Sequence, residues 1–325
     1  MAPPGRTRVR TNMHDSADIF EADLSGLHWE AWIERTDTLA GDDGYCQPLG
    51  DRHAALLIER KPTLLVTFEN FNRLSDTSNS AQPLGWSLAK ARGWSHLCLL
   101  GNGATWFRDA RVYGYFDRLV DDGFFDEFEQ VIFYGAGPCG YAAAAFSVAA
   151  PGAKVVMLSP QATLDPRVAE WDDRYLNMRR TSFTDRYGYA PDMLDAARTA
   201  VLLYDPDVEL DAMHAALFTR ANVMKFRTRF LGYQIEQSLA RMGLIAHVIG
   251  ALSEDHLTPL ALARMWRARR DETPYLANVM RRLVADERDR LTILHCRNAL
   301  SRRVGGPRFR KALAMAEARL EERGT

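Results

Sequence analysis

The chain has 325 residues, of which 47% are hydrophobic, and it carries a formal net charge of -1 at pH 7. This length suits one large α/β domain with appended elements, and the composition is that of an ordinary globular protein. The near-neutral charge gives no overall argument for a nucleic-acid or membrane-surface partner. No apolar run approaches the roughly 18 residues needed to span a bilayer.

The cysteines and histidines do not form metal-binding patterns. The four cysteines are far apart, at Cys46, Cys98, Cys139 and Cys296. None belongs to a C-x-x-C pair, which argues against a disulfide scaffold and a zinc ribbon. The histidines also lack metal-ligand spacing, so we predict no metal site and no cofactor. This cysteine usage favours a reducing, cytoplasmic location.

Taken in chain order, the sequence predicts a leader, an α/β domain and a helical annex. Residues 1–18 are polar and lack the apolar stretch of a signal peptide, so we expect a disordered leader. Short apolar runs then alternate with helical stretches, the pattern of a doubly wound, mostly parallel sheet covered on both faces. Strands are predicted over residues 54–61, 63–69, 96–101, 130–135, 154–159, 200–205 and 222–230. Helices are predicted over residues 84–92, 108–121, 138–150, 192–198, 208–218 and 233–242.

The α/β domain is expected to cover residues 19–245 and the annex residues 246–325. In the annex the strand signal stops, and apolar residues recur three and four apart among many arginines. Basic residues outnumber acidic ones there, which would suit a polyanionic partner. Interleaved acidic residues favour the other interpretation, that the arginines form solvated helix faces. We also consider self-association through the annex.

One glycine-rich stretch, FYGAGPCGYAAAAF at residues 133–146, allows two interpretations. As Gly135-x-Gly137-x-x-Gly140 it is the fingerprint of a dinucleotide site, which would indicate a flavin- or nicotinamide-binding redox protein. As a strand-to-helix turn it is a nucleophile elbow with Gly137 in the serine position. A dinucleotide site needs an acid at the end of the next strand, where this chain has Ser159. The elbow is therefore favoured.

The stretches YGAGPCGYAAAAF and VVMLSPQATLDP resemble α/β-hydrolases of the small bacterial esterase type, over roughly residues 54–245. The chain also resembles an alphaproteobacterial group commonly labelled phosphoadenosine phosphosulfate reductase, a label that implies a redox-active cysteine. It lacks the E-C-G-x-H cluster and the S-G-G-x-D loop of true reductases. The hydrolase resemblance implies the order nucleophile, acid, histidine along the chain.

Two of the three catalytic positions implied by this resemblance are replaced. Gly137 stands at the nucleophile, Asp205 matches the acid, and Tyr233 stands where the histidine is expected. We therefore predict a degenerate triad and a non-hydrolytic protein that binds a ligand or partner. Cys139 is a candidate thiol at the start of a helix, although a buried structural cysteine is favoured. His214 is expected to be a packed or surface histidine.

Three segments are expected to meet at the cleft: residues 69–76, residues 101–109, and a lid insertion at about 166–192. The predicted ligand-binding residues are Asn70, Asn102, Trp106, Arg108, Arg174, Arg179 and Arg180. Guanidinium groups suit an anion and aromatic faces suit a sugar, so we expect a small anionic or carbohydrate ligand. Two alternatives stay open: the lid arginines pair with its aspartates, or the cleft runs a different reaction using Asp205, Arg108 or Cys139.

Overall fold

The computed structural model describes residues 19–324, so the predicted leader lies outside the described residues. One eight-stranded sheet forms the centre, in the order β1-β2-β4-β3-β5-β6-β7-β8. The strands are β1 (Gly44–Pro48), β2 (His53–Ile58), β3 (Thr63–Asn70), β4 (Ser95–Gly101), β5 (Gln130–Ala136), β6 (Lys154–Leu158), β7 (Thr199–Tyr204) and β8 (Val223–Arg227). Strand β2 runs antiparallel to both neighbours, and the remaining pairs are parallel.

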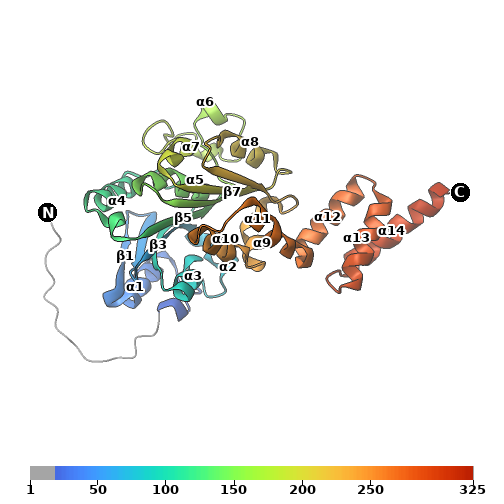
Figure 1. Ribbon diagram of the computed structural model, residues 1–325, viewed down its shortest axis with the longest axis horizontal. Helices are drawn as coiled ribbons and strands as arrows, with labels where there is room; N and C mark the ends of the chain where they lie inside the picture. Colours follow the sequence, from blue (N-terminus) through green and yellow to red (C-terminus); the bar gives the residue numbers. More distant parts are fainter. Residues whose placement is uncertain (1–18, 325) are drawn as a thin grey trace.

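The seven predicted strands are confirmed, and the apolar runs of β2 to β7 are buried by helices on both faces of the sheet (Figure 1). Neighbouring side chains of β5, Phe133 and Tyr134, belong to opposite core layers. Strand β1 was not predicted, since it is short and bounded by glycine and proline. Its Gly44 packs so tightly that an added Cβ would lie 1.8 Å from the Leu57 carbonyl oxygen.

The helices cover the sheet in two layers. Helices α4 and α5 contribute to one core layer, and α1, α3 and α10 contribute to the other. Up to the annex the helices are α1 (Trp29–Ala40), α2 (Leu74–Thr77), α3 (Gly85–Arg92), α4 (Ala110–Asp121), α5 (Pro138–Phe146), α6 (Pro166–Ala169), α7 (Ala190–Met193), α8 (Glu209–Leu217), α9 (Ile235–Arg241), α10 (Leu244–Ser253) and α11 (Pro259–Met265). None of the helices in residues 19–324 is long and apolar enough to cross a membrane.

The last three helices, α12 (Thr273–Ala285), α13 (Asp289–Ser301) and α14 (Pro307–Gly324), project from the α/β body (Figure 1). They have a small core of their own, made of Leu276, Met280, Cys296, Ala299 and Phe309. The boundary expected at residue 246 falls inside α10, which packs against β5 and β6. Helix α11 in turn contacts β8, so the covering of the sheet continues through α11.

Candidate functional site: the strand-to-helix elbow and its cleft

The glycine-rich stretch forms a sharp turn between β5 and α5. Gly137 has φ 56° and ψ -122°, a backbone conformation that residues other than glycine adopt only with strain. Gly135 approaches the start of α5 so closely that an added Cβ would lie 2.1 Å from the Cys139 carbonyl oxygen. Gly140 faces β6, where an added Cβ would lie 3.3 Å from the Leu158 carbonyl oxygen. These glycines therefore allow the helix to pack closely against the sheet.

Of the three positions expected for a catalytic triad, only the one expected for the acid carries an ionisable carboxyl group. At Gly137 an added Cβ would meet no heavy atom within 4 Å, so the position has room but no side chain. Asp205 is 1% exposed, and its carboxylate accepts the backbone N–H of Gly232 at 2.6 Å and of Asp207 at 2.9 Å. Tyr233 is 72% exposed and points its ring surface at solvent rather than into the core.

A cavity of about 260 Å³ lies at the tip of the elbow. Loops following β3 and β4 form part of its wall, and the start of α5, the lid insertion and α9 supply the rest. Its lining includes Phe68, Glu69, Asn70, Arg73, Trp106, Phe107, Pro138, Cys139, Tyr175 and Glu236. Ligands of open α/β sheets bind beyond the carboxyl ends of the strands, which is where this cavity lies.

Strand order, the elbow after β5 and the cleft at its tip together decide the fold. The chain has the α/β-hydrolase fold.

Solved structures with this fold resemble the chain at low sequence identity. A capsule O-acetyltransferase of Neisseria meningitidis serogroup A is 10% identical, with a TM-score of 0.42 over 66% of this chain and 99% of that one. An esterase of Pyrobaculum calidifontis is 15% identical, with a TM-score of 0.41 over 70% of this chain and 94% of that one. Mouse alpha/beta hydrolase domain-containing protein 10 is 12% identical, with a TM-score of 0.41 over 65% of this chain and 98% of that one. No model of a known protein family and no curated protein sequence matches the chain.

The structure brings only part of the predicted ligand-binding set to the α/β-hydrolase cleft. Asn70 and Trp106 line the cavity. Asn102 lies beside it, where its side-chain oxygen accepts from Asn72 at 3.5 Å. Arg179 and Arg180 are exposed, and their side chains have no hydrogen bond or ion pair with any residue of the described part of the chain.

The side chains of Arg108 and Arg174 bind to groups of the lid insertion and do not line the cavity. The Arg108 side chain is 1% exposed, donates to the carbonyl oxygens of Ser182 and Arg186, and pairs with Asp185. Because its donors are occupied within the protein, this guanidinium is not available to a ligand.

Arg174 belongs to a buried ion network that joins the lid insertion to α8. It donates to Asp172 at 2.8 Å and to Asp211 at 2.6 Å. Asp172 also lies 2.9 Å from His214 Nε2, while His214 Nδ1 accepts the N–H of Ala162. His214 is completely buried, so of the packed and surface positions expected for it the structure has the packed one.

Two charged residues of the cavity, Arg73 and Glu236, were not predicted as ligand-binding residues. Glu236 accepts a hydrogen bond from the Tyr134 hydroxyl at 2.8 Å, and burial raises the pKa of its carboxyl. Arg73 pairs with Asp76 at 3.0 Å. Arg73 lies in the loop after β3, which the sequence places at the cleft, whereas Glu236 lies on α9 and only the fold brings it to the cavity.

Cys139 lines the cavity and is half-buried. Burial raises the pKa of its thiol well above the ordinary value, and the nearby carboxyl groups of Glu236 and Glu69 act in the same direction. The reactive form of cysteine is the thiolate, so this environment makes Cys139 a poor nucleophile near neutral pH.

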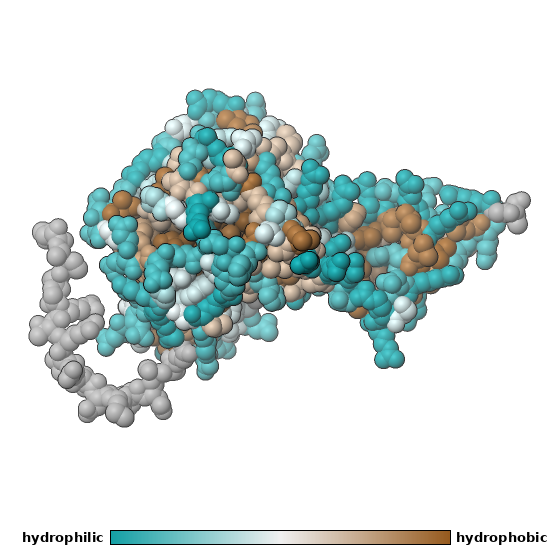
Figure 2. Space-filling view, viewed as in Figure 1, coloured by the Kyte–Doolittle hydropathy of each residue, from teal (hydrophilic) through white to brown (hydrophobic). Residues whose placement is uncertain are grey.

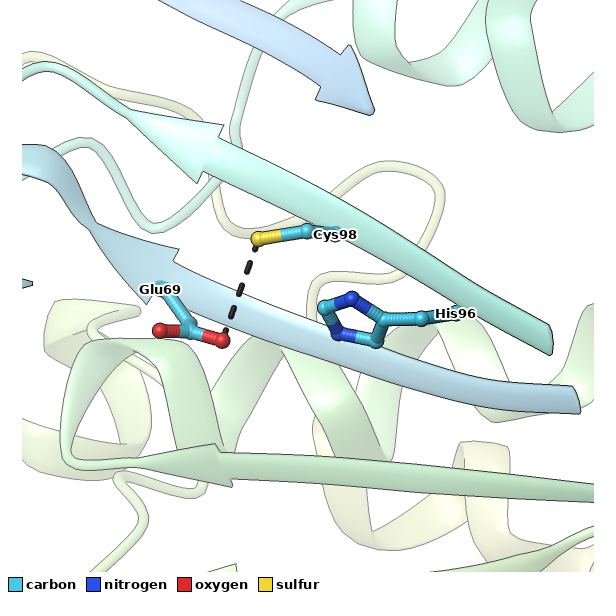
Figure 3. Close-up of side chains that lie close together, drawn as sticks. All are labelled: Glu69, His96 and Cys98. Atoms are coloured by element: carbon cyan, nitrogen blue, oxygen red, sulfur yellow. Dashed lines mark hydrogen bonds between the residues drawn. The ribbon is translucent and has the colours of Figure 1, made fainter. Parts of the chain in front are cut away.

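Beneath the cavity, Glu69 of β3 and His96 and Cys98 of β4 lie close together in the sheet (Figure 3). Their potential ligand atoms are all within 4.8 Å of one another, and this donor set is of the kind that binds zinc. The Thr67 hydroxyl, however, donates to Glu69 at 2.7 Å and lies 2.9 Å from His96 Nε2. Because a hydroxyl has one proton, His96 must be the donor in the second bond.

Glu69 is therefore held by the protein itself. Its second oxygen accepts the N–H of Leu84 at 2.8 Å, and the Cys98 thiol lies 3.8 Å from the first. Burial raises the pKa of Glu69 to about 7 and lowers that of His96 to about 3. The three residues form a closed hydrogen-bond network around Thr67, which a metal ion would have to disrupt.

Proposed function

We propose that this α/β-hydrolase-fold protein binds a small ligand in the cleft at the elbow and does not hydrolyse it by the serine route. The observation that carries the proposal is the glycine at position 137, at the tip of an otherwise intact elbow. Without a hydroxyl there no acyl-enzyme forms, and no histidine among residues 19–324 lines the cavity to act as the base.

The cavity walls favour a small polar ligand with a ring. Arg73 offers a guanidinium for an anionic group, and Trp106 and Tyr175 present aromatic surface at 4.6 Å between ring centroids. The fully buried Trp106 has an indole N–H without a partner among the described residues. Trp106 and Phe107 also have φ near +50°, a strained conformation of the kind concentrated at functional sites. We propose an acidic sugar or a similarly small anion.

The absence of serine-type hydrolysis is tested with p-nitrophenyl acetate. We expect wild-type turnover equal to the Gly137→Ala variant and to the buffer background, because neither protein has a nucleophile at the elbow. Turnover that is lost in a Cys139→Ala variant would contradict the proposal and identify a thiol hydrolase.

Ligand binding is tested by thermal shift with glucuronate and with glucose as its uncharged counterpart. We expect glucuronate to raise the melting temperature of the wild type, and Arg73→Gln to remove that shift. Tyr233→Ala is the matched control, since Tyr233 does not line the cavity and is exposed. An equal shift in wild type and Arg73→Gln would exclude Arg73 as the anion contact.

We also propose that the projecting helices mediate self-association. Apolar side chains gather over this part of the surface (Figure 2). On α13, Leu291 and Leu294 are 51% and 64% exposed and lie on one helix face. Light scattering over a range of concentrations tests this: a dimer that dissociates in Leu294→Glu supports it, and a wild-type monomer at all concentrations refutes it.

A further inference from the structure

A second, more open concavity lies where the annex begins, away from the cleft at the elbow. It has a volume of about 830 Å³ and is formed by the 3-10 helix η9 (Trp266–Asp271) together with α12 and α13. Its polar lining includes Arg267, Arg269, Arg270, Arg302, Tyr275 and His295. We call it the arginine groove.

Two of the four guanidinium groups are held in fixed positions. Arg269 donates to the Tyr275 hydroxyl at 3.2 Å and to the Trp266 carbonyl oxygen at 2.6 Å, and its guanidinium stacks 5.3 Å from the Trp266 ring centroid. Arg302 donates to the Arg270 carbonyl oxygen at 3.0 Å and pairs with Asp271. Side chains fixed in this way lose little conformational entropy when a ligand binds.

The groove has more positive charge than the protein neutralises. Asp271 is its one acidic lining residue, and it is already paired with Arg302. Arg267, Arg269 and Arg270 have no ion pair with any carboxylate in residues 19–324. Elsewhere in the annex, Arg282 pairs with Asp286 and Arg297 pairs with Glu317. Three guanidinium groups without an ion pair among the described residues thus lie on one concave surface.

We propose that the arginine groove binds a diphosphate group. Two linked phosphates carry on the order of three negative charges at neutral pH, which matches the three uncompensated guanidinium groups. The planar fork of arginine suits two phosphate oxygens at once. The inference is independent of the proposed function, because no residue of the groove lines the cleft.

Titration calorimetry with inorganic pyrophosphate at low ionic strength tests this assignment. We expect binding to the wild type that weakens as salt is added, because contacts between exposed charges are screened. The double substitution Arg267→Gln with Arg270→Gln should weaken binding about tenfold or more, because it removes two of the three guanidinium groups without an ion pair.

The controls distinguish a specific binding site from nonspecific electrostatic attraction between pyrophosphate and the protein. Arg310→Gln removes an exposed arginine of α14 that does not line the groove, and it should leave binding unchanged. Arg73→Gln, in the cleft, should also leave it unchanged. No binding by the wild type, or an equal loss in Arg310→Gln, would overturn the proposal. Citrate binding as tightly as pyrophosphate would overturn the assignment to phosphate.

Discussion

The carboxylate of Asp205 accepts the backbone N–H of Gly232 at 2.6 Å. In a triad this acid would orient the catalytic histidine. Here it fixes the loop between β8 and α9, directly before the exposed Tyr233. The carboxylate at the end of β7 thus stabilises the loop that precedes α9.

Asp205→Ala should therefore lower stability rather than activity. It leaves the N–H groups of Gly232 and Asp207 without their acceptor in a buried site, which is expected to cost about 2–4 kcal/mol of unfolding free energy in urea. Asp207→Ala is the control, since Asp207 is exposed and pairs with Arg229 at 3.3 Å. It should cost less than about 1 kcal/mol. Equal effects of the two substitutions would show that the contact to Gly232 contributes nothing.

Arg174→Ala should destabilise the lid insertion strongly. It leaves the buried carboxylates of Asp172 and Asp211 without their cation, and breaking such a network costs about 3–5 kcal/mol. Burial alone would raise the pKa of Asp172, but hydrogen bonds from His214 and Arg174 outweigh it and hold that pKa well below its ordinary value.

Limited proteolysis within residues 166–192, together with urea unfolding, measures this effect. Arg180→Ala, in the same insertion, is the control because Arg180 is exposed and unpaired within the described residues. It should change stability by no more than about 0.5 kcal/mol. An Arg174→Ala protein as resistant to protease as the wild type would refute the role given to this network.

Glu69 should make stability depend on pH. Burial raises the pKa of Glu69 to about 7, above the value of 4.5 expected in the unfolded chain, so the folded state binds the extra proton between these values. The contribution of the Glu69 proton to the unfolding free energy is complete below about pH 4.5 and is lost as the pH rises through 7. This contribution to the unfolding free energy is up to about 3 kcal/mol.

The measurement is the unfolding free energy of wild type and Glu69→Gln at pH 5 and pH 8. The wild type should lose stability relative to the variant on going to pH 8. Taking the difference between the two proteins removes the opposite contribution of His96, whose pKa is lowered to about 3 by burial. A difference that does not change with pH would mean that Glu69 is ionised in the folded protein throughout this range.

Cys139 should react slowly with thiol reagents. It is half-buried while the other three cysteines are buried, and burial raises the pKa of its thiol. We expect Ellman's reagent at pH 7.5 to modify no more than one thiol of the folded protein, more slowly than free cysteine, and none in Cys139→Ser. A reaction faster than that of free cysteine would indicate an activated thiolate.

The strands and the elbow were predictable because their signals are local. Buried parallel strands are continuous apolar runs, and the turn at Gly137 requires glycine. Strand β1 was missed because its five residues, GYCQP, carry no such run. Its place in the sheet depends on pairing with β2, which is a tertiary contact.

The cleft was less predictable, since its lining depends on which side chains find partners at long range. The sequence placed Arg108 and Arg174 near ligands, but their nearest acceptors turned out to be Asp185, Asp172 and Asp211. No spacing rule gives the direction of a long side chain. Glu236 was overlooked for the opposite reason: it occupies an ordinary helical position, and only the fold brings it to the elbow.

The lid insertion is fastened at both sides, by Arg108 within the loop near α4 and by the Arg174 network at α8. If the lid insertion moved away from the cleft to admit a ligand, the contacts of Arg108 and Arg174 would have to break each time. The proposed ligand would therefore enter the cleft past a lid insertion that keeps its position, so the size of the ligand would limit its entry. For a ligand of the proposed kind, the rate of association with the protein should fall abruptly once the molecule is wider than the opening of the cleft.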